Sequence, residues 1–241
     1  MSTVGYFELI SGAPIICDKV TLYPPKLGDI RDVGYDNYRE FISLFLMDKD
    51  SYAALFSIKN ASMLDRWTTL QLITRTPPLR ATLLRALSFF IHSDVCYSED
   101  VGYFVDGDAA VYLTLDEIGS YRRIILRLCN VEDTGDQSQV TYRNARAKKT
   151  YEKIQQCKAK KKKQQSSDKN LELPNLIAAV AAFSSTYNLL NIWGLTVYQF
   201  YDQFARLSGK IQLGIIGQKW AAWGTDSFDF STWYKALSTT E

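Results

Sequence analysis

The sequence has one histidine, His92, and four widely spaced cysteines among its 241 residues. The cysteines form no CxxC pair and have no companion histidine, so the usual zinc-ligand spacings are absent. A disulfide scaffold is not expected in a chain of this length. The GxSxG, P-loop and dinucleotide-binding motifs are also missing. These absences exclude the common metal, hydrolase and nucleotide-binding classes, and we predict a protein that is not an enzyme and uses no cofactor.

Long apolar runs are absent as well. The longest, residues 176–183, is far shorter than the roughly 20 residues that span a bilayer. The first residues lack the basic start and apolar core of a signal peptide. Because 46% of the residues are hydrophobic and 13% are aromatic, there is enough apolar surface for a core. We therefore expect a soluble, cytoplasmic protein without a membrane partner.

The few residues that could act in catalysis have simpler explanations. His92 follows the apolar Phe89-Phe90-Ile91, and no nucleophile or base lies near it in the sequence. The paired carboxylates Asp106/Asp108 and Asp116/Glu117 fit turns and helix caps better than acid–base chemistry. We interpret all of them as structural.

Positive charge is concentrated in one segment. Residues 143–169 carry a net charge of +9 against +2 for the whole chain, so the rest is net −7. The densest run comprises Lys158, Lys160, Lys161, Lys162 and Lys163. Such a run can bind phosphates, but more often it keeps a linker helix solvated. No aromatic residue is interleaved to stack on bases. We favour a solvated linker, with binding to an acidic protein partner or to nucleic acid as the alternatives.

The pattern of apolar residues predicts a mainly α protein in three parts. These are a helical N-terminal domain with one or two small β-hairpins (1–131), a loop and Lys-rich linker helix (132–170), and a small aromatic-rich helical domain (171–241). In the first half of the N-terminal domain we expect a hairpin over 13–23, a helix from Leu27 closed by Gly34, a helix capped by Asp36 and a less regular helical stretch around 64–73. These are followed by a helix opened by Pro77-Pro78, a hairpin with a tight Asp106-Gly107 turn and a helix from Thr114 to Leu128. The linker contains a helical segment over 142–165.

In the C-terminal part, Thr196-Val-Tyr-Gln199 has the spacing of a capping box. We expect Phe200, Phe204 and Leu207 to continue a buried face, and Gly209 to end that helix. A further helix is expected over 213–223.

Four aromatic residues of this part are candidates for binding a partner: Trp193, Tyr198, Trp220 and Trp223. Aromatic residues at helical spacing usually form the core. However, the segment has more of them than a small helical domain can easily bury, and exposed aromatics mark partner surfaces. Both interpretations stay open for individual residues.

Two stretches together carry a resemblance to a known group of proteins. They are GAPIICDKVTLYPPKLGDIRDVGYDNY (12–38) and NLLNIWGLTVYQFYDQFARL (188–207), with the Lys-rich segment between them. This pairing resembles tail assembly chaperones and related tail morphogenesis proteins of tailed bacteriophages that infect Gram-positive hosts.

The resemblance implies a chaperone of the host cytoplasm that binds the tape-measure protein in many copies. It would keep this long helical chain soluble and extended until tail-tube subunits polymerise, and it implies self-association and contact with those subunits. Two alternatives remain: a structural tail or baseplate subunit, and a nucleic-acid-binding regulator that uses the lysine run.

Overall fold

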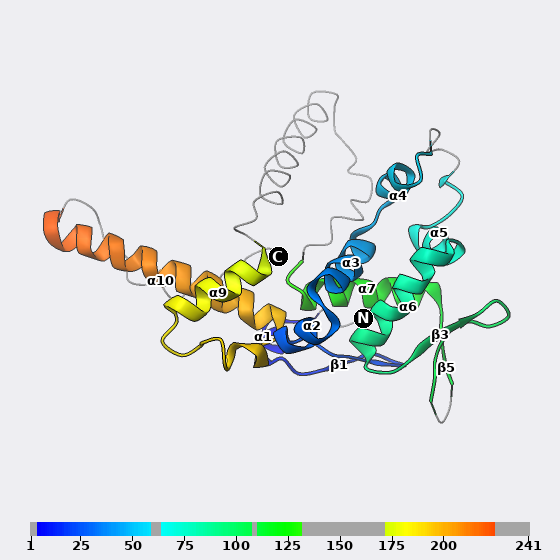
Figure 1. Cartoon of the computed structure of the whole chain (residues 1–241), viewed down its shortest axis with the longest axis horizontal. Coiled ribbons are helices and arrows are strands. Elements are labelled where there is room, and N and C mark those ends of the chain that lie inside the picture. The colour runs from blue at the N-terminus through cyan, green and yellow to red at the C-terminus, as the bar shows by residue number, and fades with distance from the viewer. Residues whose placement is uncertain (1–3, 59–63, 108–109, 132–171, 225–241) are drawn as a thin grey trace. The chain divides into compact units, whose positions relative to one another are not determined.

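The computed structural model describes residues 4–58, 64–107, 110–131 and 172–224, and over these ranges the protein is mainly α, as predicted (Figure 1). The chain divides into two compact units. The first comprises Met1–Asp136 with Gly194–Tyr201, and the second comprises Gln137–Trp193 with Asp202–Glu241. Residues 171–241, predicted as one domain, are thus shared between the units, and the domain bounds themselves stay a prediction. The expected helix over 142–165 lies outside the described residues.

The first unit contains seven of the described helices and both described sheets. The helices are α1 (Tyr6–Ser11), α2 (Leu27–Val33), α3 (Tyr35–Leu46), α4 (Lys49–Leu55), α5 (Thr69–Arg75), α6 (Pro77–Ile91) and α7 (Leu115–Leu128). The strands are β1 (Ile15–Ile16), β2 (Thr21–Leu22), β3 (Val95–Ser98), β4 (Gly102–Val105) and β5 (Val111–Leu113). The short helices α1 and α4 had no clear sequence pattern and were not predicted.

The N-terminal hairpin and the helix after it are as predicted. Strands β1 and β2 are antiparallel, with Ile15 opposite Leu22, and α2 ends where Gly34 takes a positive φ of 90°. The expected role of Asp36 is wrong, because Gly34 occupies the N-cap position of α3 and Asp36 lies in its first turn. The N-cap therefore lies two residues earlier than expected, at a position whose positive φ is adopted easily only by glycine.

Helices α3 and α6 lie side by side and form the centre of the first unit (Figure 1). Pro77 and Pro78 open α6 as expected, because a proline in the first turn removes no helical hydrogen bond. Phe41 and Phe45 from α3 and Phe90 from α6 are almost completely buried. A second small cluster forms around Tyr52, Ala53, Leu64 and Leu72.

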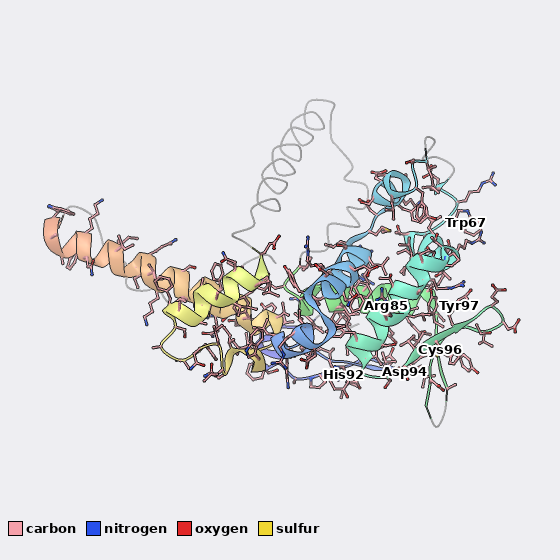
Figure 2. All side chains as sticks on the ribbon, viewed as in Figure 1. Trp67, Arg85, His92, Asp94, Cys96 and Tyr97 are labelled. Atoms are coloured by element: carbon pink, nitrogen blue, oxygen red, sulfur yellow. The ribbon has the colours of Figure 1, made fainter. Side chains whose placement is uncertain are left out.

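The larger sheet has the order β3-β4-β5 and is antiparallel throughout. Strand β3, which was not predicted, follows α6 after a short connection that contains His92 and Asp94, and Cys96 and Tyr97 lie on the strand (Figure 2). The expected tight turn at Asp106-Gly107 is wrong. Val105 pairs with Val111, so the connection between β4 and β5 spans residues 106–110. The capping box of Thr114 and Glu117 opens α7 as predicted.

The remaining helices are α9 (Leu173–Phe183), the 3₁₀ helix η3 (Ile192–Gly194) and α10 (Val197–Trp223). The capping box at Thr196 is confirmed: Gln199 Oε1 accepts from the Thr196 N–H at 2.9 Å, and Thr196 Oγ1 accepts from the Gln199 N–H at 3.2 Å. Of the predicted buried face, Phe200 is fully buried, whereas Phe204 and Leu207 are half-buried.

Gly209 does not end this helix. The two predicted helices are one, and α10 continues to Trp223. The helix ends at Gly224, which has a φ of +59° and donates its N–H to the Trp220 carbonyl at 2.7 Å. Glycine terminates a helix when it takes the left-handed conformation. Gly224 takes this conformation and Gly209 does not.

Candidate partner-binding surface

His92 caps the C-terminal end of α6 and stacks on an aromatic ring. It has a positive φ of 59°, and its ring lies 4.2 Å from that of Tyr23 at an interplanar angle of 6°. The Tyr23 N–H donates to the Phe90 carbonyl at 2.8 Å, which holds β2 against the end of α6. These contacts give His92 a structural role at the end of α6.

Glu117 is engaged at the start of α7. Its carboxylate accepts from the Thr114 N–H at 2.7 Å and lies 2.9 Å from the Lys19 ammonium. The hydrogen bond from Lys19, followed by that from the Thr114 backbone, lowers the pKa of Glu117. This ion pair ties the turn of the β1–β2 hairpin to α7. Within the described ranges no three His, Cys, Asp or Glu side chains are placed to hold a metal ion.

Tyr198 lies in the first unit and is half-buried. Its ring makes an edge-to-face contact with Tyr6, with centroids 6.4 Å apart. The chain around it is fixed by backbone bonds from Leu27 to Leu195 and from Val197 to Pro25, both 2.9 Å. These interactions make Tyr198 part of the packing that anchors the start of α10.

Trp193 lies in the second unit and is also half-buried. Its indole N–H donates to the Leu189 carbonyl at 2.6 Å. The indole therefore holds the turn that precedes α10, and only part of its ring is accessible to a partner.

Trp220 and Trp223 lie on the last turns of α10 and are 44% and 70% exposed. Three isoleucines on the same half of the helix are exposed as well: Ile211, Ile215 and Ile216. An exposed apolar region of this kind is typical of a surface that binds another protein. Of the four aromatic candidates, the structure leaves these two most accessible, and their binding role stays a prediction.

A pocket of about 200 Å³ lies within the second unit. One side is formed by Val180 and Phe183 of α9 and by the turn at residues 184–187; the other is formed by Gln203, Leu207 and Lys210 of α10. Phe183 is 71% exposed at the rim, whereas Val180 is buried at the base. The turn is held by Ser184 Oγ, which accepts the N–H groups of residues 186 and 187 at 3.1 and 3.0 Å.

Leu207, Ile211 and Ile215 continue from the pocket along α10. Their spacing of four residues places them in a row on one side of the helix. This row was not predicted, because Gly209 was expected to end the helix. The i, i+4, i+8 spacing would have revealed the row if the helix had been followed through the glycine.

The charges on this part of α10 are of one sign. Between Gln203 and Gly224 the sequence has Arg206, Lys210 and Lys219 and no acidic residue. Arg206 pairs with Asp202 one turn earlier, at 2.8 Å. The predicted basic segment with Lys158, Lys160, Lys161, Lys162 and Lys163 lies outside the described residues.

A comparison with protein families identifies one match. Residues 160–238 match the model of the YomV second domain, a phage-derived family named after a protein of a Bacillus phage region. The match covers about a third of the chain, and it includes α9, α10, the pocket and the exposed row. No curated protein and no solved structure matches the chain. No described helix has the length and apolar character needed to cross a bilayer.

Proposed function

We propose that this chain is a non-catalytic protein-binding factor in phage tail assembly that acts in the host cytoplasm. It holds the tape-measure protein soluble and extended until tail-tube subunits polymerise around it. The match to a phage-derived domain family supports the phage setting. The resemblance over residues 12–38 and 188–207 supports the more specific role in the tail.

The observation that carries the proposal is the exposed apolar surface at the C-terminal half of α10. Ile211, Ile215, Ile216, Trp220 and Trp223 are each at least 44% exposed. An amphipathic helix binds such a surface by burying its own apolar face there. A tape-measure protein offers many such faces in succession, and covering them prevents the aggregation that exposed apolar stripes cause.

The proposal is tested by co-expressing the full chain with the long helical protein encoded beside it. We expect that protein to become soluble, to co-purify with this chain and to be released when tail-tube subunits are added. Replacing Trp220 and Trp223 together by Ala should reduce the co-purified amount, because large buried aromatics often dominate binding. The matched control is Leu190→Ala, since Leu190 is 91% exposed but lies outside α10.

A neighbouring protein that stays insoluble would contradict the chaperone role. Mass spectrometry of purified virions then separates the alternatives, because a structural tail or baseplate subunit persists in the finished particle. An assembly chaperone should be absent from it.

A further inference from the structure

We infer that the pocket beside Lys210 and the row Leu207, Ile211 and Ile215 form one binding site for an acidic amphipathic helix. In this site the row buries the apolar face of the helix, and Lys210 pairs with one of its carboxylates. The inference rests on the proposed function, in which a helical protein is bound, and it specifies the charge of that protein and the place where it binds.

The first step is the continuity of the surface. Leu207 lines the pocket, and Ile211 and Ile215 follow it at four-residue intervals on the same side of α10. Ile211 is 44% and Ile215 62% exposed. Phe183, at the end of α9, adds an apolar rim to the pocket. The pocket and the row therefore present one apolar strip along the helix.

The second step is the charge beside this strip. Asp202 pairs with Arg206, but Lys210 has no ion-pair or hydrogen-bond partner within the described part of the chain. The next basic residue, Lys219, follows nine positions later, and no acidic residue lies between Gln203 and Gly224. Complementary charge on a partner both accelerates encounter and selects the partner. The surface therefore favours a helix with glutamate or aspartate beside its apolar face.

The third step is the polar lining of the pocket. In the described part of the structure the side chains of Thr186 and Gln203 have no hydrogen-bond partner. Both can donate to a carboxylate, as can the Lys210 ammonium. A cavity of about 200 Å³ holds several waters at about 30 Å³ each. It therefore has room for one acidic side chain that replaces them.

A second copy of this chain fits the surface less well. Two copies packed through α10 would bring the lysines of both helices to the same interface, and unbalanced like charges disfavour such a complex. The positive charge beside the apolar strip therefore favours an acidic helix over a second copy of this chain.

The test uses the full chain and synthetic amphipathic peptides of about 18 residues, or five helical turns. All peptides share leucines at i, i+3, i+4 and i+7 spacing, and the flanking positions are Glu, Gln or Lys. Binding is measured by isothermal titration calorimetry at low and high salt. We expect the Glu peptide to bind at least about tenfold more tightly than the Gln peptide, and the Lys peptide to bind most weakly. Added salt should reduce this preference.

Two pairs of variants locate the site. Lys210→Glu should weaken the Glu peptide by about tenfold or more, whereas Arg66→Glu, the same charge change on an exposed residue of the first unit, should not. Replacing Ile211 and Ile215 together by Ser should weaken every peptide, whereas Leu190→Ser should not. All five substituted residues are exposed, and circular dichroism tests whether each of the four variants is folded.

Equal affinity for the Glu and Lys peptides, or full affinity in Lys210→Glu, would overturn the inference. So would a concentration-dependent dimer that the Ile211/Ile215 variant dissociates, because the row would then bind a second copy. The peptides do not depend on the tape-measure protein. If that protein is captured equally by the wild type and by all four variants, the proposed function stands and the site is elsewhere. If the Glu peptide binds as expected and the tape-measure protein is not captured, the site stands and the tail function fails.

Discussion

Cys129 illustrates how the environment of one residue sets its chemistry. It follows α7, is 1% exposed, and forms a side-chain hydrogen bond with Tyr38. Burial raises the pKa of the Cys129 thiol to about 12. Burial also raises the pKa of Tyr201, at the start of α10, to about 12. At neutral pH all these groups are uncharged, as packing in the core requires.

We expect Cys129 to resist alkylation in the native protein. Among the cysteines that the structure describes, Cys17 and Cys96 are half-buried and should react with iodoacetamide before Cys129 does at neutral pH. Burial and, secondarily, the charge of Asp18 raise the pKa of Cys17, which lowers the fraction of reactive thiolate at that site at neutral pH. Peptide mass spectrometry after a short pulse measures each site, with urea-unfolded protein as the control in which all sites react. Labelling of Cys129 at the rate of Cys96 would show that Cys129 is not buried as described.

Glu117 gives a prediction about pH. Because the Lys19 hydrogen bond lowers its pKa in the folded state, its contribution to stability is present above the unfolded pKa of about 4.3 and is lost as the pH falls through the folded value. We expect Glu117→Gln to lower the melting temperature at about pH 7, and to leave it nearly unchanged at about pH 3. Thermal unfolding followed by circular dichroism measures both. Glu99→Gln, at an exposed turn, is the matched control, and an equal shift at both pH values would rule out the ion pair as the cause.

At the scale of elements, α10 shows that the conformation of a glycine matters more than its presence. Gly209 lies inside the helix, and apart from the neighbouring helix backbone a Cβ atom there would meet no described atom within 4 Å. Gly224 has the left-handed conformation that ends the helix, with φ of +59°. The same substitution should therefore have opposite effects at the two positions.

We expect Gly209→Ala to stabilise the protein by about 0.5–1 kcal/mol, because alanine loses less backbone entropy in a helix. Gly224→Ala should destabilise it by about 1 kcal/mol, since a Cβ atom is strained in the left-handed region. The free energy of unfolding from urea denaturation compares both with the wild type. If Gly209→Ala is destabilising instead, the helix is interrupted at Gly209 as its sequence alone suggested.

The elements that could be predicted from the sequence are those with local causes. The capping boxes at Thr114 and Thr196 join residues three apart, so their spacing is sufficient to identify them. Strand β3 could not be predicted in the same way. It is held by β4 and by the hydrogen bond from the Val95 N–H to Ser88 Oγ at 2.9 Å, and no local pattern encodes these contacts.

The candidate site, too, could be predicted only in part from the sequence. The aromatic residues at the end of α10 were recognisable by their composition, and Trp220 and Trp223 are exposed. The pocket joins residues 180–187 with residues 203–210. It arises only when α9 and α10 are placed in space, and the part played by Phe183 and Lys210 was therefore not visible in the sequence.

At the scale of the whole molecule, the densest positive charge and the exposed apolar side chains of α10 lie in different segments. Residues 143–169 carry a net charge of +9 and the rest of the chain is net −7. The exposed apolar side chains of α10 lie outside this basic segment. If the two segments have separate roles, removing charge from the first should leave the function of the second intact.

We therefore expect the variant with Lys160, Lys161, Lys162 and Lys163 all replaced by Gln to solubilise the tape-measure protein as well as the wild type does. The lysines act in this interpretation as a solvated linker, and glutamine keeps the helix propensity while removing the charge. Co-purified partner measures this directly, with Lys210→Glu as the variant expected to lose capture. The wild type and the glutamine variant are also titrated with duplex DNA at about 50 and 200 mM salt. Three results together would favour a nucleic-acid-binding regulator and assign the function to the basic segment. Wild-type DNA binding would collapse over this salt range, it would disappear in the glutamine variant, and the glutamine variant would also lose partner capture.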